Sequence, residues 1–167
     1  MDRSEARRPY PGEGSDEARG LPSPPVATIL IASDAPWVVD ELRAALEEPE
    51  TTIRVVSAGE AVPDAVDADE PDLVILDLQI GNMGGMATCV HLHLEADAGR
   101  LPSVPVLMLL DRRADVFLAR RSSADGFVLK PLDSIRLRKA ARALLDGGTY
   151  EDPTGAPTEV SGPAPVG

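Results

Sequence analysis

An apolar run that ends in a single acid constrains the fold of this chain most. Residues 73–76 read Leu-Val-Ile-Leu, Asp77 follows them, and a glycine-containing loop comes next at 78–85. A run of this length without polar residues is typical of a strand that is buried on both faces, which occurs mainly in parallel sheets covered by helices. The sequence therefore predicts a parallel strand with Asp77 at its carboxyl end, where ligands bind in open α/β sheets.

Strand-like and helix-like segments alternate through the middle of the chain. Strands are expected at about 27–32, 52–56, 72–77, 105–110 and 127–129. Helices are expected after Pro36, at about 59–68, 85–96 and 112–121, and between Asp133 and Gly147. The segment 59–68 is the weakest of these because it contains Pro63. Five strand–helix repeats predict an α/β fold with a doubly wound, five-stranded parallel sheet, (βα)5.

Both ends of the chain differ in composition from the middle. Residues 1–25 are rich in Arg, Glu, Gly, Ser and Pro, and residues 148–167 are rich in Pro, Gly and Thr. Neither segment has an apolar period, so we expect two disordered tails around one compact domain at 26–147. The C-terminal tail is too short and too polar to form an output domain.

The overall charge and the apolar runs exclude several classes of partner. A formal net charge of −12 argues against direct nucleic-acid binding, which needs a basic surface. No run approaches the roughly 18 apolar residues of a membrane helix, and no secretory signal is visible at the N-terminus. Cys89 is the only cysteine, so no intrachain disulfide can form. We therefore expect a cytoplasmic protein without membrane contact.

Two further strand ends carry charged residues. Asp34 follows the first strand and Lys130 follows the fifth, at the same predicted sheet edge as Asp77. Two acids and a lysine at one edge form a candidate phosphoryl-transfer site. An alternative role for Asp34 is to cap the helix that begins at Pro36.

Several segments, taken in order, resemble a response-regulator receiver domain, the phospho-acceptor part of bacterial two-component signalling. The resemblance covers about residues 26–146. It implies the flavodoxin-like receiver topology with strand order 2-1-3-4-5. The segments that carry it are Asp34, Asp72 to Asp77, Asn82 to Gly85, Pro105 to Leu109 and Ala124 to Pro131.

The resemblance also implies a set of roles. Asp77 would be the phospho-acceptor, and Lys130 would pair first with Asp77 and then with a phosphoryl oxygen. A Mg²⁺ ion would be held by Asp34, Asp77 and the main-chain carbonyl of Gln79. Pro131 would follow a cis peptide bond that fixes the position of the ammonium group. Such a domain is not an enzyme beyond its own phosphorylation and dephosphorylation.

The chain departs from the family pattern at three positions. Ser33 stands where the family has a second acid, so we expect weaker Mg²⁺ binding. Leu110 stands where the family has Thr or Ser, whose hydroxyl normally couples phosphorylation to an aromatic residue, here Phe127. Asp111 stands where a small residue is usual, and its carboxylate would repel a phosphoryl group if it pointed inward.

Two functions remain in competition. The first is an atypical single-domain response regulator that accepts a phosphoryl group from a histidine kinase, a phosphotransfer protein or a small phosphodonor. It would signal through protein contacts, as a homodimer or with an effector, on the face formed by residues 112–121, 127–129 and 133–146. The second is a pseudo-receiver that acts as an adaptor without phosphorylation. A haloacid-dehalogenase-type phosphatase is disfavoured because Gln79 stands where such enzymes need an acid.

Overall fold

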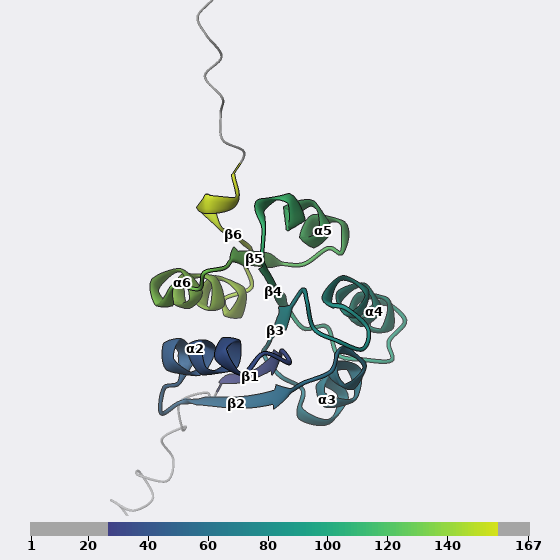
Figure 1. Cartoon of the computed structure of the whole chain (residues 1–167). Coiled ribbons are helices and arrows are strands. Elements are labelled where there is room, and N and C mark those ends of the chain that lie inside the picture. The colour runs from purple at the N-terminus through teal and green to yellow at the C-terminus, as the bar shows by residue number, and fades with distance from the viewer. Residues whose placement is uncertain (1–26, 157–167) are drawn as a thin grey trace, which may run out of the picture.

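The computed structural model describes residues 27–156 (Figure 1). The strands are β1 (Ala27–Ala32), β2 (Thr51–Val56), β3 (Leu73–Asp77), β4 (Val106–Leu110), β5 (Gly126–Leu129) and β6 (Tyr150–Glu151). The α-helices are α2 (Pro36–Leu46), α3 (Val62–Asp69), α4 (Gly85–Asp97), α5 (Val116–Arg121) and α6 (Ser134–Leu145). Short 3-10 turns are η2 (Gly59–Ala61), η3 (Arg113–Asp115) and η4 (Pro153–Gly155).

The strands form one parallel sheet in the order β2-β1-β3-β4-β5-β6. Its first five strands have the predicted order, so the predicted fold class is confirmed. The register pairs Asp77 with Leu109 and Leu110 with Leu129. Because parallel strands end at the same edge, the residues that follow β1, β3, β4 and β5 meet there.

Helices cover both faces of the sheet, α2 and α6 on one side and α3, α4 and α5 on the other (Figure 1). Alternate strand residues serve the two layers. In β3, Leu73 and Ile75 pack toward α2 and α6, whereas Val74 and Leu76 pack in the opposite layer. Every residue of β3 is buried, as the apolar run predicts for a strand covered on both faces.

Local signals set the helix boundaries as expected. Pro36 lies in the first turn of α2, and the Asp133 side chain caps α6 by accepting a hydrogen bond from the Arg136 backbone N–H. Pro63 lies in the first turn of α3, where its missing N–H costs nothing, so residues 59–61 form η2 and the α-helix starts at Val62.

The chain stays ordered beyond α6, which corrects one boundary. The composition predicts that residues 148–156 belong to the disordered C-terminal tail, but Tyr150–Glu151 forms β6 on the outer edge of β5, and η4 follows it. Composition did not predict this order because the segment has no apolar stripe. It is held instead by buried polar contacts centred on Asp152. The disorder expected for 1–25 and for 157–167 concerns residues outside the described part of the chain.

No helix between residues 27 and 156 is long and apolar enough to cross a membrane.

Candidate functional site

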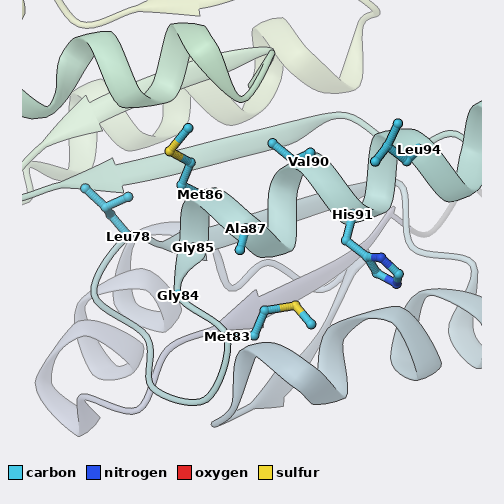
Figure 2. Close-up of a pocket in the computed structure, with 9 residues that line it drawn as sticks. All are labelled: Leu78, Met83, Gly84, Gly85, Met86, Ala87, Val90, His91 and Leu94. Carbon is cyan, nitrogen blue, oxygen red and sulfur yellow. The ribbon is translucent and has the colours of Figure 1, made fainter.

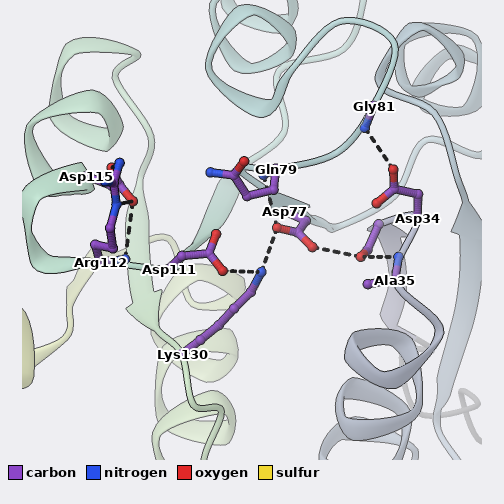
Figure 3. Close-up of polar contacts among 10 residues, drawn as sticks. Asp34, Ala35, Asp77, Gln79, Gly81, Asp111, Arg112, Asp115 and Lys130 are labelled. Atoms are coloured by element: carbon purple, nitrogen blue, oxygen red, sulfur yellow. Dashed lines mark hydrogen bonds and ion pairs between the residues drawn. The ribbon is translucent and has the colours of Figure 1, made fainter.

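Four charged residues meet at the carboxyl edge of the sheet (Figure 3). Asp77 is the last residue of β3, Asp111 follows β4 and Lys130 follows β5. Asp34 lies two residues beyond β1. The neighbouring order of these strands brings together the three charged residues that the sequence analysis placed here, and it adds Asp111.

The Asp77 carboxylate is buried and fully surrounded by donors. Its side chain is 2% exposed. Oδ1 accepts hydrogen bonds from the Lys130 Nζ at 2.9 Å and from the Gln79 backbone N–H at 3.1 Å. Oδ2 accepts one from the Ser33 Oγ at 2.8 Å. Because a buried carboxylate is stable only when it is paired and hydrogen-bonded, these contacts explain how the charge is held at the end of β3.

Ser33 joins the end of β1 to Asp77. Its hydroxyl donates to Asp77 and accepts a hydrogen bond from the Ala35 backbone N–H at 3.2 Å. The side chain that stands in place of a second acid is therefore a neutral donor, and it adds no negative charge beside Asp77.

Asp34 is exposed and faces the loop after β3. Its Oδ2 accepts a hydrogen bond from the Gly81 backbone N–H at 3.1 Å. A side chain at position 81 would bring its Cβ within 3.2 Å of the same oxygen, so glycine permits this approach. No side chain caps α2, so the alternative role of Asp34 as a helix cap is wrong.

Lys130 is held between two carboxylates. Its Nζ lies 2.9 Å from Asp77 Oδ1 and 3.2 Å from Asp111 Oδ1, and its side chain is 10% exposed. The ammonium also lies 5.6 Å from the centre of the Trp37 ring, within the range of a cation–π contact. The Lys130–Pro131 peptide bond is cis, as the resemblance implies.

The Asp111 side chain points toward the site, a direction that the sequence does not predict. The loop that carries it is fixed by the buried Asp115 carboxylate, which accepts hydrogen bonds from the Arg112 backbone N–H at 3.2 Å and from its guanidinium at 2.9 Å. The single ammonium of Lys130 therefore pairs with the carboxylates of Asp77 and Asp111, while the Asp34 carboxylate lies on the other side of Asp77 and faces Gly81 (Figure 3).

Leu110 and Phe127, the two expected switch positions, lie in the apolar core. They are 0% and 3% exposed and belong to one cluster with Val116 and Leu129, on the side of the sheet covered by α3, α4 and α5. Leu110 offers no hydroxyl at the end of β4, so its side chain cannot hydrogen-bond to a group on Asp77.

The donors at this edge suit one hydrated Mg²⁺ ion. No cluster of three or more His, Cys, Asp or Glu side chains that could hold a metal occurs within residues 27–156. Mg²⁺ does not need such a cage, because it is usually bound by one or two carboxylates, several waters and phosphate oxygens. By residue type, Asp34, Asp77 and the main-chain carbonyl of Gln79 are the oxygen groups that would hold such an ion, and Ser33 cannot add a third carboxylate.

A separate hollow of about 690 Å³ lies along α4 beside the loop after β3 (Figure 2). Its lining is almost wholly apolar and includes no acid or lysine. It therefore has no part in the charged site. The side chains around it are Leu78, Met83, Met86, Ala87, Val90, His91 and Leu94.

The sequence did not predict two contacts of Lys130, those with the ring of Trp37 and with the carboxylate of Asp111, nor the ordered segment after α6. Trp37 stands three residues after Asp34, in the first turn of α2, which was the available signal for an aromatic side chain near this edge.

Comparisons with known proteins agree with this fold. The family model described as the response regulator receiver domain matches residues 29–142. The DNA-binding response regulator MtrA of Mycolicibacterium smegmatis is 34% identical over 119 residues, which cover 70% of this chain and 50% of that protein. The chain thus spans about half the length of the curated relatives it matches.

Solved structures give the same result. A signal receiver domain of a histidine kinase from Syntrophus aciditrophicus superposes with a TM-score of 0.64 at 26% identity, covering 84% of this chain and 97% of that one. The BeF3-activated receiver domain of Klebsiella pneumoniae RstA superposes with a TM-score of 0.61 at 25% identity, covering 71% and 97%. The expected resemblance is confirmed: the chain belongs to the response regulator receiver domain family.

Proposed function

We propose that this domain accepts a phosphoryl group on Asp77 in two-component signalling in the cytoplasm, and that its output is a change in protein contacts. Phosphorylation on an aspartate is typical of the family, and receiver domains are generally not enzymes. The observation that carries the proposal is the buried Asp77 carboxylate with the Lys130 ammonium 2.9 Å away.

The reaction needs Asp77 to attack phosphorus while the bond to the donor breaks. An Asp77 oxygen would form the new P–O bond, and the electron pair of the broken bond would leave with the donor, a phosphohistidine imidazole or acetate. Ser33 and the Gln79 N–H hold the carboxylate in one orientation, and Lys130 would pair with a phosphoryl oxygen. Mg²⁺, when bound by Asp34, Asp77 and the Gln79 carbonyl, would offset the negative charge of the transferring group.

The charge at the site makes metal dependence a strong expectation. This sheet edge carries three carboxylates, two of which pair with the one ammonium of Lys130, and a phosphoryl group adds more negative charge. Lys130 cannot neutralise all of these groups, so transfer without Mg²⁺ would have to overcome mutual repulsion at close range.

A second function, the phosphorylation-independent adaptor, is favoured by two specific observations. The Asp111 carboxylate already accepts a hydrogen bond from the Lys130 ammonium. Leu110, a buried apolar residue, stands at the position where a hydroxyl would hydrogen-bond to the phosphoryl group. An adaptor would keep the fold and the Asp77–Lys130 pair as structural features only.

The partners would be a histidine kinase or phosphotransfer protein as donor, and a second copy or an effector as receiver of the signal. Receiver domains interact with such donors. The face expected for output is formed by α5, β5 and α6. Because β6 pairs with β5 and Glu151 forms an ion pair with Arg120 of α5 at 3.2 Å, an effector on this face would also meet residues 150–156. The absence of direct nucleic-acid binding stays a prediction from the net charge of −12.

The test is intact mass spectrometry after incubation with acetyl phosphate and Mg²⁺, with Asp77→Asn as the matched control. A single phosphoryl adduct of about 80 Da that is absent from the control is expected. An ordinary receiver domain treated in parallel shows that the donor is active. If that domain is labelled and this one is not, and a histidine kinase phosphodonor also fails, the adaptor function replaces the first proposal.

A further inference from the structure

Asp152 is a buried acid in a segment that the phospho-acceptor site does not include. It follows β6, and its side chain is 0% exposed. Oδ2 accepts a hydrogen bond from the Leu129 backbone N–H at 2.8 Å. Oδ1 accepts hydrogen bonds from the Thr154 N–H at 2.9 Å and the Thr154 Oγ1 at 2.8 Å. Oδ2 also pairs with the Arg136 guanidinium. Such a completely satisfied buried carboxylate fixes the chain on both sides of it.

Arg136 extends this contact to the backbone around Lys130. Besides pairing with Asp152, its guanidinium donates to the Pro131 carbonyl at 2.8 Å and to the Leu129 carbonyl at 3.3 Å. Asp152 itself binds the Leu129 N–H. The residues immediately before and after Lys130 are therefore both tied to one Arg–Asp pair.

The rest of the C-terminal segment packs closely on β5. The Asp152 N–H donates to the Phe127 carbonyl at 3.2 Å, which extends the pairing of β6 with β5. A Cβ at Gly155 would lie 2.9 Å from side-chain carbons of Leu129 and Phe127, so only glycine allows η4 to approach the strand this closely. Residues 150–155 therefore pack directly against β5, the strand that Lys130 follows.

We propose that Asp152 and Arg136 are positioning residues for the phospho-acceptor site: together they hold the backbone of Lys130 so that its ammonium reaches Asp77. A lysine side chain has four rotatable bonds, so its ammonium is placed reliably only if its backbone is fixed and its tip is paired. The Lys130 backbone N–H is held by the Leu110 carbonyl at 2.8 Å, and the Arg136–Asp152 pair holds the peptides on either side.

The expected effect of this arrangement on phosphorylation rests on the proposed function. Its effect on the position of Lys130 does not depend on that function. Loss of the Arg136–Asp152 pair, which we call the clamp, would move the ammonium relative to Asp77, and small displacements of a charge-stabilising group lower transfer rates steeply. We expect at least a tenfold slower labelling of Asp77 by acetyl phosphate in a clamp variant.

The experiment compares the variants Asp152→Asn and Arg136→Gln with Glu151→Gln. The control variant changes an exposed acid in the same segment, whose partner is Arg120 and not the clamp. The readout is the lysine side-chain signal in NMR spectra of the isotopically labelled protein. Lys130 and Lys139 are the only lysines of the chain, so the exposed Lys139 serves as an internal reference.

In the unchanged protein and in Glu151→Gln, the Lys130 signal should be shifted from that of Lys139 and its ammonium protons should exchange slowly. In the folded clamp variants, the Lys130 signal should move toward that of Lys139. This readout needs no phosphorylation, so its failure is distinguishable from failure of the proposed function. Folded clamp variants with an unchanged Lys130 signal would overturn the proposal.

Arg136→Lys keeps the proposal testable if the stronger variants do not fold. Lysine retains a charge for Asp152 but lacks the planar fork that reaches the Leu129 and Pro131 carbonyls at once. We expect this variant to fold and to show a displaced Lys130 signal. A signal identical to that of the unchanged protein would refute the role of the fork.

Discussion

Asp111 would compete with a phosphoryl group on Asp77 for Lys130, and we expect Asp111→Asn to release that competition. The Asp111 Oδ1 lies 3.2 Å from the Lys130 Nζ, and its side chain is 37% exposed. A partly exposed ion pair of this kind contributes at most about 1 kcal/mol after solvent screening. Since 1.4 kcal/mol corresponds to a factor of ten, removing the pair should strengthen the binding of an aspartyl-phosphate analogue by up to about fivefold.

The assay is a titration with beryllium fluoride in the presence of Mg²⁺, followed by tryptophan fluorescence. Trp37 is the only tryptophan of the chain, and its ring lies 5.6 Å from the Lys130 Nζ. A change in the partners of Lys130 therefore occurs directly beside the reporter. Intact mass after acetyl phosphate treatment gives a second, independent measure of the same preference.

The control is Asp97→Asn, which removes one acid at the end of α4, on the opposite edge of the sheet. It separates the local effect from the change in net charge. If Asp111→Asn binds the analogue no more tightly than the control, Asp111 does not compete for Lys130. Weaker binding would show that Asp111 supports the site, which would reverse the argument.

Four further predictions concern single positions. Leu110→Thr should lower the free energy of unfolding by about 3 kcal/mol, measured by urea denaturation, because it removes buried carbon and leaves a hydroxyl in an apolar cluster. Ser33→Asp should strengthen Mg²⁺ binding by about tenfold in a fluorescence titration, because it adds a carboxylate beside Asp77; unchanged affinity would show that position 33 does not face the metal. Burial alone would raise the pKa of Asp152, but its backbone and side-chain donors lower it below the usual range. Its stabilisation is therefore present above about pH 4 and is lost as the pH falls through the lowered pKa, so Asp152→Asn should cost about 3 kcal/mol near pH 7 and progressively less as the pH falls below about 4. Burial raises the pKa of Cys89 to about 11, so Ellman's reagent should react with the folded protein at least a hundredfold more slowly than with the protein in urea.

The fold could be predicted because its strands are marked by composition and its helices by boundary residues. The apolar run 73–76 required cover on both faces, and Pro36 and Asp133 marked two helix starts. The strand β6 could not be predicted this way. It has two residues, and the segment around it is rich in Pro and Gly, so its order depends on contacts with residues more than fifteen positions away.

The sequence predicted which charged residues meet at this sheet edge, but it did not predict the directions of their side chains. Parallel strands end together, which was enough to bring Asp77 and Lys130 to one place. The direction of Asp111 depends on the loop after β4, where the Arg112–Asp115 contacts fix the backbone. A carboxylate at a strand end can face the solvent or the site, and nothing in the local sequence distinguishes the two.

These contacts limit how a phosphoryl group on Asp77 could be sensed elsewhere in the domain. A group shifts a conformational equilibrium only through contacts that differ between its two states. The Leu110 side chain makes no polar contact that could change, whereas the Lys130 ammonium would have to move from Asp77 and Asp111 toward the phosphoryl oxygens. Asp111 would then lose its partner, and the loop after β4 and the clamped peptides beside Lys130 would be the first elements affected. In this domain, the proposed signal therefore starts with a lysine that changes partners, and it leads toward α5 and residues 150–156.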